Sequence, residues 1–364
     1  MQLYQKEKTF LYYFLPLFAT KLLNITADNI ILQLVAVCCF LVFLTYFARI
    51  RVPSNIFQIY IVLGLYSTML VFTCGKQGVL FSVLTVILMR GIDLSRIVYK
   101  KCLGVGVIFV LLSCYLEKDV GGVMSRYING EWTEIVKRSN ILFISYIAVM
   151  FLYILQKKDF LKWKVIIPFI ICSYIMSIYT GSRTGMVIVV LFFLVAFALQ
   201  LNLFRRTIVK YLCIATPLIC LGLSYFAASN YGKYEYLDIL DMMTQGRVAQ
   251  GYMFLNRYGL SIIGQHIEEN FGSDGGDFAC LDSAYMDMLI CEGVIFTIFW
   301  IVVSMKVIKY MWDQNRMIEV AILVTYAVYG MTETFLINCF LNISIFFYGE
   351  FLYAKYDKSL DYYY

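Results

Sequence analysis

The chain has 364 residues, of which 61% are hydrophobic and 15% charged, with four prolines and a formal net charge of +6. A soluble domain of this length needs a more mixed composition, and here the apolar segments recur along the whole chain. The composition therefore excludes an ordinary soluble domain and a protein with a single membrane anchor. It predicts one integral membrane domain over residues 1–364.

About twelve apolar segments are candidates for helices that cross a bilayer, which requires roughly 20 residues each. They lack the alternation of polar and apolar residues that is typical of membrane β-barrels, so we expect an all-α polytopic bundle. The first and fourth segments are short for a span. The expected spans are residues 9–23, 29–48, 55–73, 78–92, 102–116, 139–156, 164–180, 184–203, 210–228, 284–305, 317–333 and 339–354.

The lysines and arginines predict the orientation of the bundle. With the N-terminus in the cytoplasm, every expected inner connection carries at least two of them, as the positive-inside rule requires. This alternation supports an even number of spans and places both termini in the cytoplasm. Because the basic residues are spread over short inner loops rather than gathered in a patch with aromatics, we expect no nucleic-acid partner.

The cysteine and histidine content predicts no metal site and no cofactor. Most of the eleven cysteines lie in apolar runs, where they act as small hydrophobic residues, and the single histidine is His266. An acidic, glycine-rich string at Gly272–Asp277 has too few of the features of a calcium loop, so we interpret it as a mobile hinge.

Two long connections are expected on the outer face, at residues 117–138 and 229–282. The second is the large extracytoplasmic loop of the chain. Its stretch from Asp238 to Tyr258 is amphipathic and is predicted to form a helix along the membrane surface. Loops of this length are uncommon unless they are functional, and the alternative is a passive cap.

A short outer turn, Thr180–Gly185, combines features of an anion site. Gly181 allows the turn, Ser182 or Thr184 can cap the following helix, and Arg183 stands at the N-terminus of that helix. Helix N-terminal amides together with a guanidinium group suit a phosphate at the level of the lipid headgroups. The alternative is that Arg183 only reaches ordinary lipid phosphates.

Arg247 and Arg257 are the arginines of the large loop. If their stretch is helical, a separation of ten residues places them about 80° apart on adjoining faces. Taken by itself, each of these arginines is interpreted as a solvated surface charge. Glu292 and Glu333 fall within apolar segments, where an ionised carboxylate is unfavourable, so we expect both to face the interior and to pair with arginines.

Several short strings, taken in order, resemble the bacterial O-antigen and capsular polysaccharide polymerases of the Wzy type. The resemblance covers residues 141–353, and its strength lies in the combined order of the motifs. The motifs are Thr180–Gly185, Gly246–Arg247 with Gly264, Leu281–Tyr285 with Glu292–Gly293, and Thr332–Glu333 followed by Asn338 and Asn342.

This resemblance implies a glycosyltransferase of the bacterial cytoplasmic membrane. Such enzymes transfer a glycan linked to undecaprenyl diphosphate onto the next lipid-linked repeat unit at the outer face, without a nucleotide sugar or metal. Flippase and chain-length regulator proteins are the partners that it implies. The related ligases usually carry a histidine where this chain has Asp282–Ser283, which favours a polymerase. A flippase or transporter is the other alternative, and the small number of mid-helix charges speaks against it.

The resemblance and the residue chemistry together give the candidate site. Arg183 and Arg247 are expected to contact the diphosphate, and the acceptor hydroxyl could lose its proton to Asp282, Asp277 or Glu292. The catalytic candidates are Arg183, Arg247 and Asp282, and the substrate-binding candidates are Ser182, Thr184, Arg138, Arg257, Tyr285 and Glu292.

Overall fold

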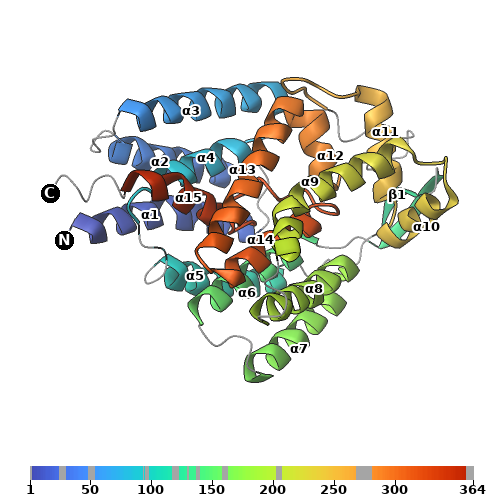
Figure 1. The fold of residues 1–364 in the computed structure, drawn as a ribbon, viewed down its shortest axis with the longest axis horizontal. Helices are drawn as coiled ribbons and strands as arrows, with labels where there is room; N and C mark the ends of the chain where they lie inside the picture. Colours follow the sequence, from blue (N-terminus) through green and yellow to red (C-terminus); the bar gives the residue numbers. More distant parts are fainter. Residues whose placement is uncertain are drawn as a thin grey trace.

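A computed structural model describes residues 2–23, 30–47, 54–92, 94, 98–116, 123–128, 131–136, 140–157, 163–201, 207–267 and 281–357. In these ranges the chain is a helical bundle with one small β-hairpin (Figure 1). The helices are α1 (Gln2–Leu22), α2 (Ile30–Phe47), α3 (Ser54–Cys74), α4 (Gly78–Leu88), α5 (Tyr99–Leu116), α6 (Asn140–Gln156), α7 (Trp163–Thr180), α8 (Arg183–Gln200), α9 (Thr207–Ser229), α10 (Glu235–Thr244), α11 (Arg247–Tyr258), α12 (Ala284–Asp287), the π-helical turn η3 (Met288–Glu292), α13 (Val294–Asp313), α14 (Met317–Tyr329) and α15 (Ile345–Asp357).

Seven of these helices are long and apolar enough to cross a membrane: α2, α3, α5, α7, α8, α9 and α13. The other five predicted spans fall on α1 and on four apolar helices of fewer than 18 residues, which are α4, α6, α14 and α15. The chain is thus a multi-helix protein of membrane type. The structure does not establish all twelve expected spans.

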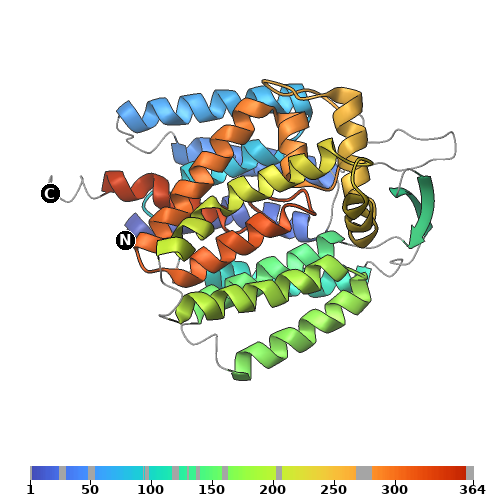
Figure 2. The same cartoon turned by 45° about the vertical axis from the view of Figure 1, so that its right-hand side comes forward.

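The bundle has two distinct ends. The start of α1 and the end of α15 lie together at one end, which we call the terminal end (Figures 1 and 2). The helices α10 and α11 and the hairpin lie at the opposite end, the loop end. Helix α14 is buried almost throughout, between α8, α9 and α13, whereas α2 and α7 expose most of their apolar side chains, as expected for helices that face lipid.

Aromatic side chains pack the core beside α1. The rings of Phe10, Phe14 and Phe18 stack at spacings of four residues, with centroids 5.5 and 5.4 Å apart. Phe346 of α15 meets Phe14 edge-on at 5.1 Å. The spacing of four residues places these rings on one face of α1, so this face is fixed against the C-terminal part of the chain.

The predicted span 284–305 is not one continuous helix. It consists of α12, η3 and α13, and the break lies at Gly293, where φ is +95°. The reason is that another segment crosses the break and bonds to it: Val294 N donates to Ser261 O at 2.8 Å, and Gln265 N donates to Cys291 O at 2.8 Å. A Cβ on residue 293 would lie 2.7 Å from the backbone N of Gly264, so glycine is required there.

The predicted span 339–354 is helical only from Ile345. Residues 330–344 form an irregular run of turns between α14 and α15. Its polar backbone groups are bonded inside the protein: the Asn342 side chain donates to Leu336 O at 2.7 Å, and Cys339 N donates to Ser82 Oγ of α4 at 3.0 Å. Irregular backbone within a membrane bundle is stable only when it is buried in this way or lines a cavity.

The two outer connections also differ from the prediction. The amphipathic stretch expected as one helix over 238–258 is two helices, α10 and α11, because Gln245 and Gly246 both have positive φ. The connection expected at 117–138 contains an antiparallel hairpin, β1 (Val123–Ile128) paired with β2 (Glu131–Val136), which the prediction did not include, while the bundle itself is helical as predicted. Residues 268–280 of the large loop lie outside the described residues.

Candidate functional site

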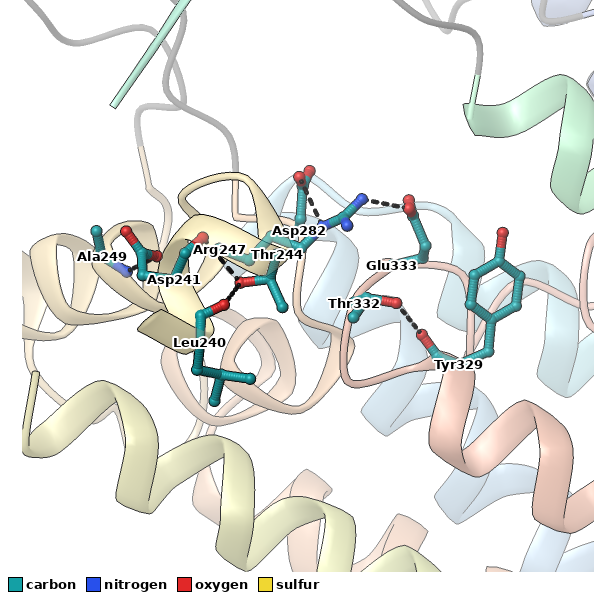
Figure 3. A network of polar contacts seen from close by, with 9 residues as sticks. All are labelled: Leu240, Asp241, Thr244, Arg247, Ala249, Asp282, Tyr329, Thr332 and Glu333. Carbon is teal, nitrogen blue, oxygen red and sulfur yellow. Dashed lines mark hydrogen bonds and ion pairs between the residues drawn. The ribbon is translucent and has the colours of Figure 1, made fainter. Parts of the chain in front are cut away.

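Arg247 is the first residue of α11 and lies between two carboxylates at the loop end (Figure 3). Its Nη2 is 2.5 Å from Oε1 of Glu333, and its Nε is 3.4 Å from Oδ2 of Asp282. The arginine side chain is only 5% exposed. The sequence reading of Arg247 as a solvated charge is therefore wrong, while the expectation that Glu333 faces inward and pairs with an arginine is confirmed.

Local backbone geometry places Arg247 in this position. The carboxylate of Asp241, buried in the last full turn of α10, accepts a hydrogen bond from Ala249 N at 2.9 Å, and Gly246 N donates to Asp241 O at 2.9 Å. The last turn of α10 thus caps the first turn of α11. Glu333 follows the end of α14, and Asp282 precedes α12, so three separate segments converge on the guanidinium.

Arg183 and Arg247 line the same small, open pocket. Arg183 is exposed at the start of α8. Gly181 has a φ of +66°, and Ser182 caps α8 by accepting a hydrogen bond from Gly185 N at 3.3 Å, as predicted for this turn.

Three helices start at this pocket: α6 at Asn140, α8 at Arg183 and α11 at Arg247. Their N-terminal amides carry positive partial charge, so the pocket combines two guanidinium groups with three positive helix ends. Asp282 and Glu333 compensate the charge of Arg247. Arg183 has no ion pair within the described residues, so it is the uncompensated cation of the pocket.

Arg247 also stands at the edge of an apolar groove of about 870 Å³ between α9, α10 and α11. Apolar side chains of the three helices line most of it, including Leu223, Leu240 and Val248. Ser283 and Thr332 are among its few polar lining residues. One guanidinium therefore separates an apolar groove from a small cationic pocket.

A third cavity, of about 1390 Å³, lies on the other side of α12 at the same end of the bundle. Lys76, in the turn between α3 and α4, pairs there with Asp287 of α12. Glu292 of η3 lines the cavity as well and is 2% exposed. Sequence reasoning missed Lys76 and Asp287, although both are charges at the ends of apolar runs, where pairing is expected.

The remaining candidates lie in different places. Thr184 lines the pocket of Arg183. Tyr285 is buried and donates to Ala327 O of α14 at 2.8 Å, so its hydroxyl holds α12 against α14 rather than facing the pocket of Arg183. Arg257 is exposed near the end of α11, with its guanidinium carbon 5.6 Å from the centroid of the Tyr258 ring. Arg138 lies outside the described residues, and so does Asp277.

The structure thus brings four of the predicted residues, Arg183, Ser182, Thr184 and Arg247, to one pocket, with Asp282 held against Arg247. Glu292 lies in the neighbouring cavity. Comparison of the chain with models of protein families, with curated proteins and with solved structures finds no match.

Proposed function

We propose that the chain is a polysaccharide polymerase of the cytoplasmic membrane, a glycosyltransferase that joins oligosaccharide repeat units linked to undecaprenyl diphosphate. The observation that carries this proposal is the position of Arg247, between an apolar groove and a cationic pocket at the loop end. We take the loop end as the outer face, as the distribution of basic residues predicts.

A lipid-linked diphosphate has two chemically different parts, and they match the apolar groove and the cationic pocket of this site. Its isoprenoid chain is apolar and its diphosphate is a compact anion. The groove of about 870 Å³ beside α9 suits a segment of the chain, and the diphosphate then lies against Arg247 and Arg183. Arginine is suited to this contact because its planar fork can bind two phosphate oxygens at once.

The chemistry requires positive charge where these arginines lie. Transfer of the glycan breaks the bond between the sugar C1 and the diphosphate oxygen, and the electron pair stays with the diphosphate. Groups fixed beside the leaving oxygens stabilise this developing charge more than they stabilise the ground state. Asp282 and Glu333 hold the guanidinium of Arg247 from two sides, so little reorganisation is needed during the reaction.

The two carboxylates also set a limit on the role of Arg247. Asp282 and Glu333 each carry a negative charge beside its guanidinium, and these charges offset the positive charge of Arg247. An incoming diphosphate is attracted only if additional positive charge is nearby. Arg183 and the three helix N-termini supply it, so we expect Arg183 to contribute most to diphosphate affinity.

The test uses purified protein in lipid vesicles with a synthetic undecaprenyl-diphosphate-linked repeat unit. A polymerase produces a ladder of products, a ligase gives one addition to another acceptor, and a flippase moves the lipid without lengthening it. We expect a ladder for the unaltered protein and its loss for Arg183→Lys and Arg183→Met. Lys233→Met, which removes an exposed cation of the same end outside the pocket, is the matched control.

A ladder of normal length from Arg183→Met would remove the proposed role of this arginine. Transport of the lipid without any lengthening of the glycan would instead show that the chain acts as a flippase and not as a polymerase. The Arg247→Lys variant is also expected to make no polymer. Because this substitution disturbs the two ion pairs as well, the amount of variant protein in the vesicles and its stability must be measured in the same experiment.

A further inference from the structure

Three carboxylates at the loop end could take a proton from an acceptor hydroxyl, and the structure distinguishes between them. Asp282 lies 3.4 Å from the guanidinium Nε of Arg247, and Asp287 is paired with Lys76. A carboxylate held by a cation is a weaker base, because proton binding must compete with the ion pair. Glu292 differs from both: its Oε2 is buried and has no hydrogen-bond partner among the residues that the structure describes.

Glu292 lines the cavity of about 1390 Å³ on the other side of α12. This cavity is large enough for one or more sugar rings, and its wall mixes polar groups with the rings of Phe81 and Phe340. Lys21 and Asn338 add a cation and an amide to the wall. Hydroxyl-rich ligands need this combination, since they are recognised by hydrogen bonds at their edges and by apolar contact at their ring faces.

The cavity and the site of Arg247 share their walls. Asp282 touches Arg247, Ser283 lines the apolar groove, and Ala284 lines the cavity. In the segment after α14, Glu333 binds Arg247 and the next residue, Thr334, lines the cavity. A ligand in the cavity therefore lies directly behind the segments that hold the guanidinium.

We propose that this cavity binds the acceptor sugar and that Glu292 takes the proton from its attacking hydroxyl. This inference rests on the proposed function. The hydroxyl oxygen forms the new bond to C1 of the donor sugar while the bond from C1 to the diphosphate breaks. The electron pair leaves with the diphosphate, and the hydroxyl proton passes to Glu292 Oε2.

The environment of Glu292 is compatible with this role. Burial and the nearby carboxylate of Asp287 raise the pKa of the Glu292 carboxyl above its ordinary value, and Lys76 opposes this shift. A base with a pKa near the working pH is the most effective in proton transfer. The titratable groups around it are Tyr66 and Cys74 of α3, Lys76, Asp287 of α12 and Cys291 of η3, with Lys21 on the cavity wall and His266 beside Gly75.

The experiment compares Glu292→Gln and Glu292→Asp with the unaltered protein in vesicles. Two quantities are measured: binding of undecaprenyl diphosphate without sugar, and the rate of transfer from pH 6 to pH 9. Asp313→Asn, which removes a carboxylate paired with Lys210 at the last residue of α13, is the control. Thermal unfolding of each variant shows whether it is folded.

We expect the Gln variant to bind undecaprenyl diphosphate normally while transfer falls roughly 100-fold or more. In the unaltered protein we expect the rate to rise with pH as Glu292 loses its proton, and to level off once the carboxyl is ionised. This rise is absent in the Gln variant, whereas the Asp variant retains part of it. A merely structural role for Glu292 would not remove the pH dependence.

The outcomes separate this inference from the proposed function. If the unaltered protein makes a ladder and the Gln variant transfers at a similar rate with the same pH profile, the role of Glu292 is refuted while the polymerase stands. If the unaltered protein neither binds undecaprenyl diphosphate nor transfers, the proposed function fails, and the inference about Glu292 fails with it.

Discussion

Removal of the charge of Arg247 should destabilise the protein strongly, independently of any activity. In Arg247→Met, Glu333 and Asp282 lose the cation that lies 2.5 and 3.4 Å from them. At an effective dielectric constant of about 20, these contacts are each worth on the order of 5–7 kcal/mol of Coulomb energy. Most of this is offset by the desolvation of the three groups, so the net loss is expected to be about 3–5 kcal/mol, as for other broken buried ion pairs.

The assay is chemical unfolding of the purified protein in detergent, followed by the fluorescence of its tryptophans. Arg183→Met is the comparison, because the exposed Arg183 should change the free energy of unfolding by no more than about 0.5 kcal/mol. Equal stability of Arg247→Met and the unaltered protein would refute the assignment of a buried ion group.

Three further substitutions test the local geometry by the same assay. Gly185→Ala places a Cβ 2.2 Å from the ring of Phe143 and should cost about 1–3 kcal/mol, part of which Phe143→Leu restores; an unchanged stability would mean that α6 and α8 are farther apart. Gly293→Ala should lose about 1–3 kcal/mol, because φ is +95° and the new atom meets Gly264 N at 2.7 Å, and a neutral result would argue against the break before α13. Ser182→Ala removes the cap of α8 and should cost about 1 kcal/mol; no loss would show that the cap contributes little.

The sequence predicted those features that depend on residues close together in the chain. The apolar runs located the helices, because length and hydropathy suffice to identify a helix of membrane type. The turn at Gly181 and the cap at Ser182 followed from residue chemistry within a few positions. The pocket of Arg183 and Arg247 was thus predictable in part, from the start of α8 and its Arg183.

The features that the sequence did not predict depend on contacts between distant segments. Arg247 and Glu333 are 86 positions apart, and nothing local to Arg247 indicates that it is buried. The break at Gly293 exists because the segment around Gly264 bonds to it, and hydropathy alone favours a continuous helix there. Lys76 is a single charge in a short turn, and its partner Asp287 lies 211 positions away.

The position of two ion groups, those of Arg247 and Lys76, favours the proposed chemistry at one face over passage across the membrane. The ion group of Arg247, the pair of Lys76 with Asp287, and the break in the backbone at Gly293 all belong to the loop end. A carrier that alternates between two faces needs a polar path that reaches both. In the described part of this chain, stacked aromatic rings and not polar groups fill the core beside α1, where Phe14 packs edge-on against Phe346. Buried charges are unfavourable in lipid, and in this chain Lys76, Asp287 and Glu292 line one cavity while Arg247 stands at the edge of the apolar groove; the proposed reaction would give these charges a use.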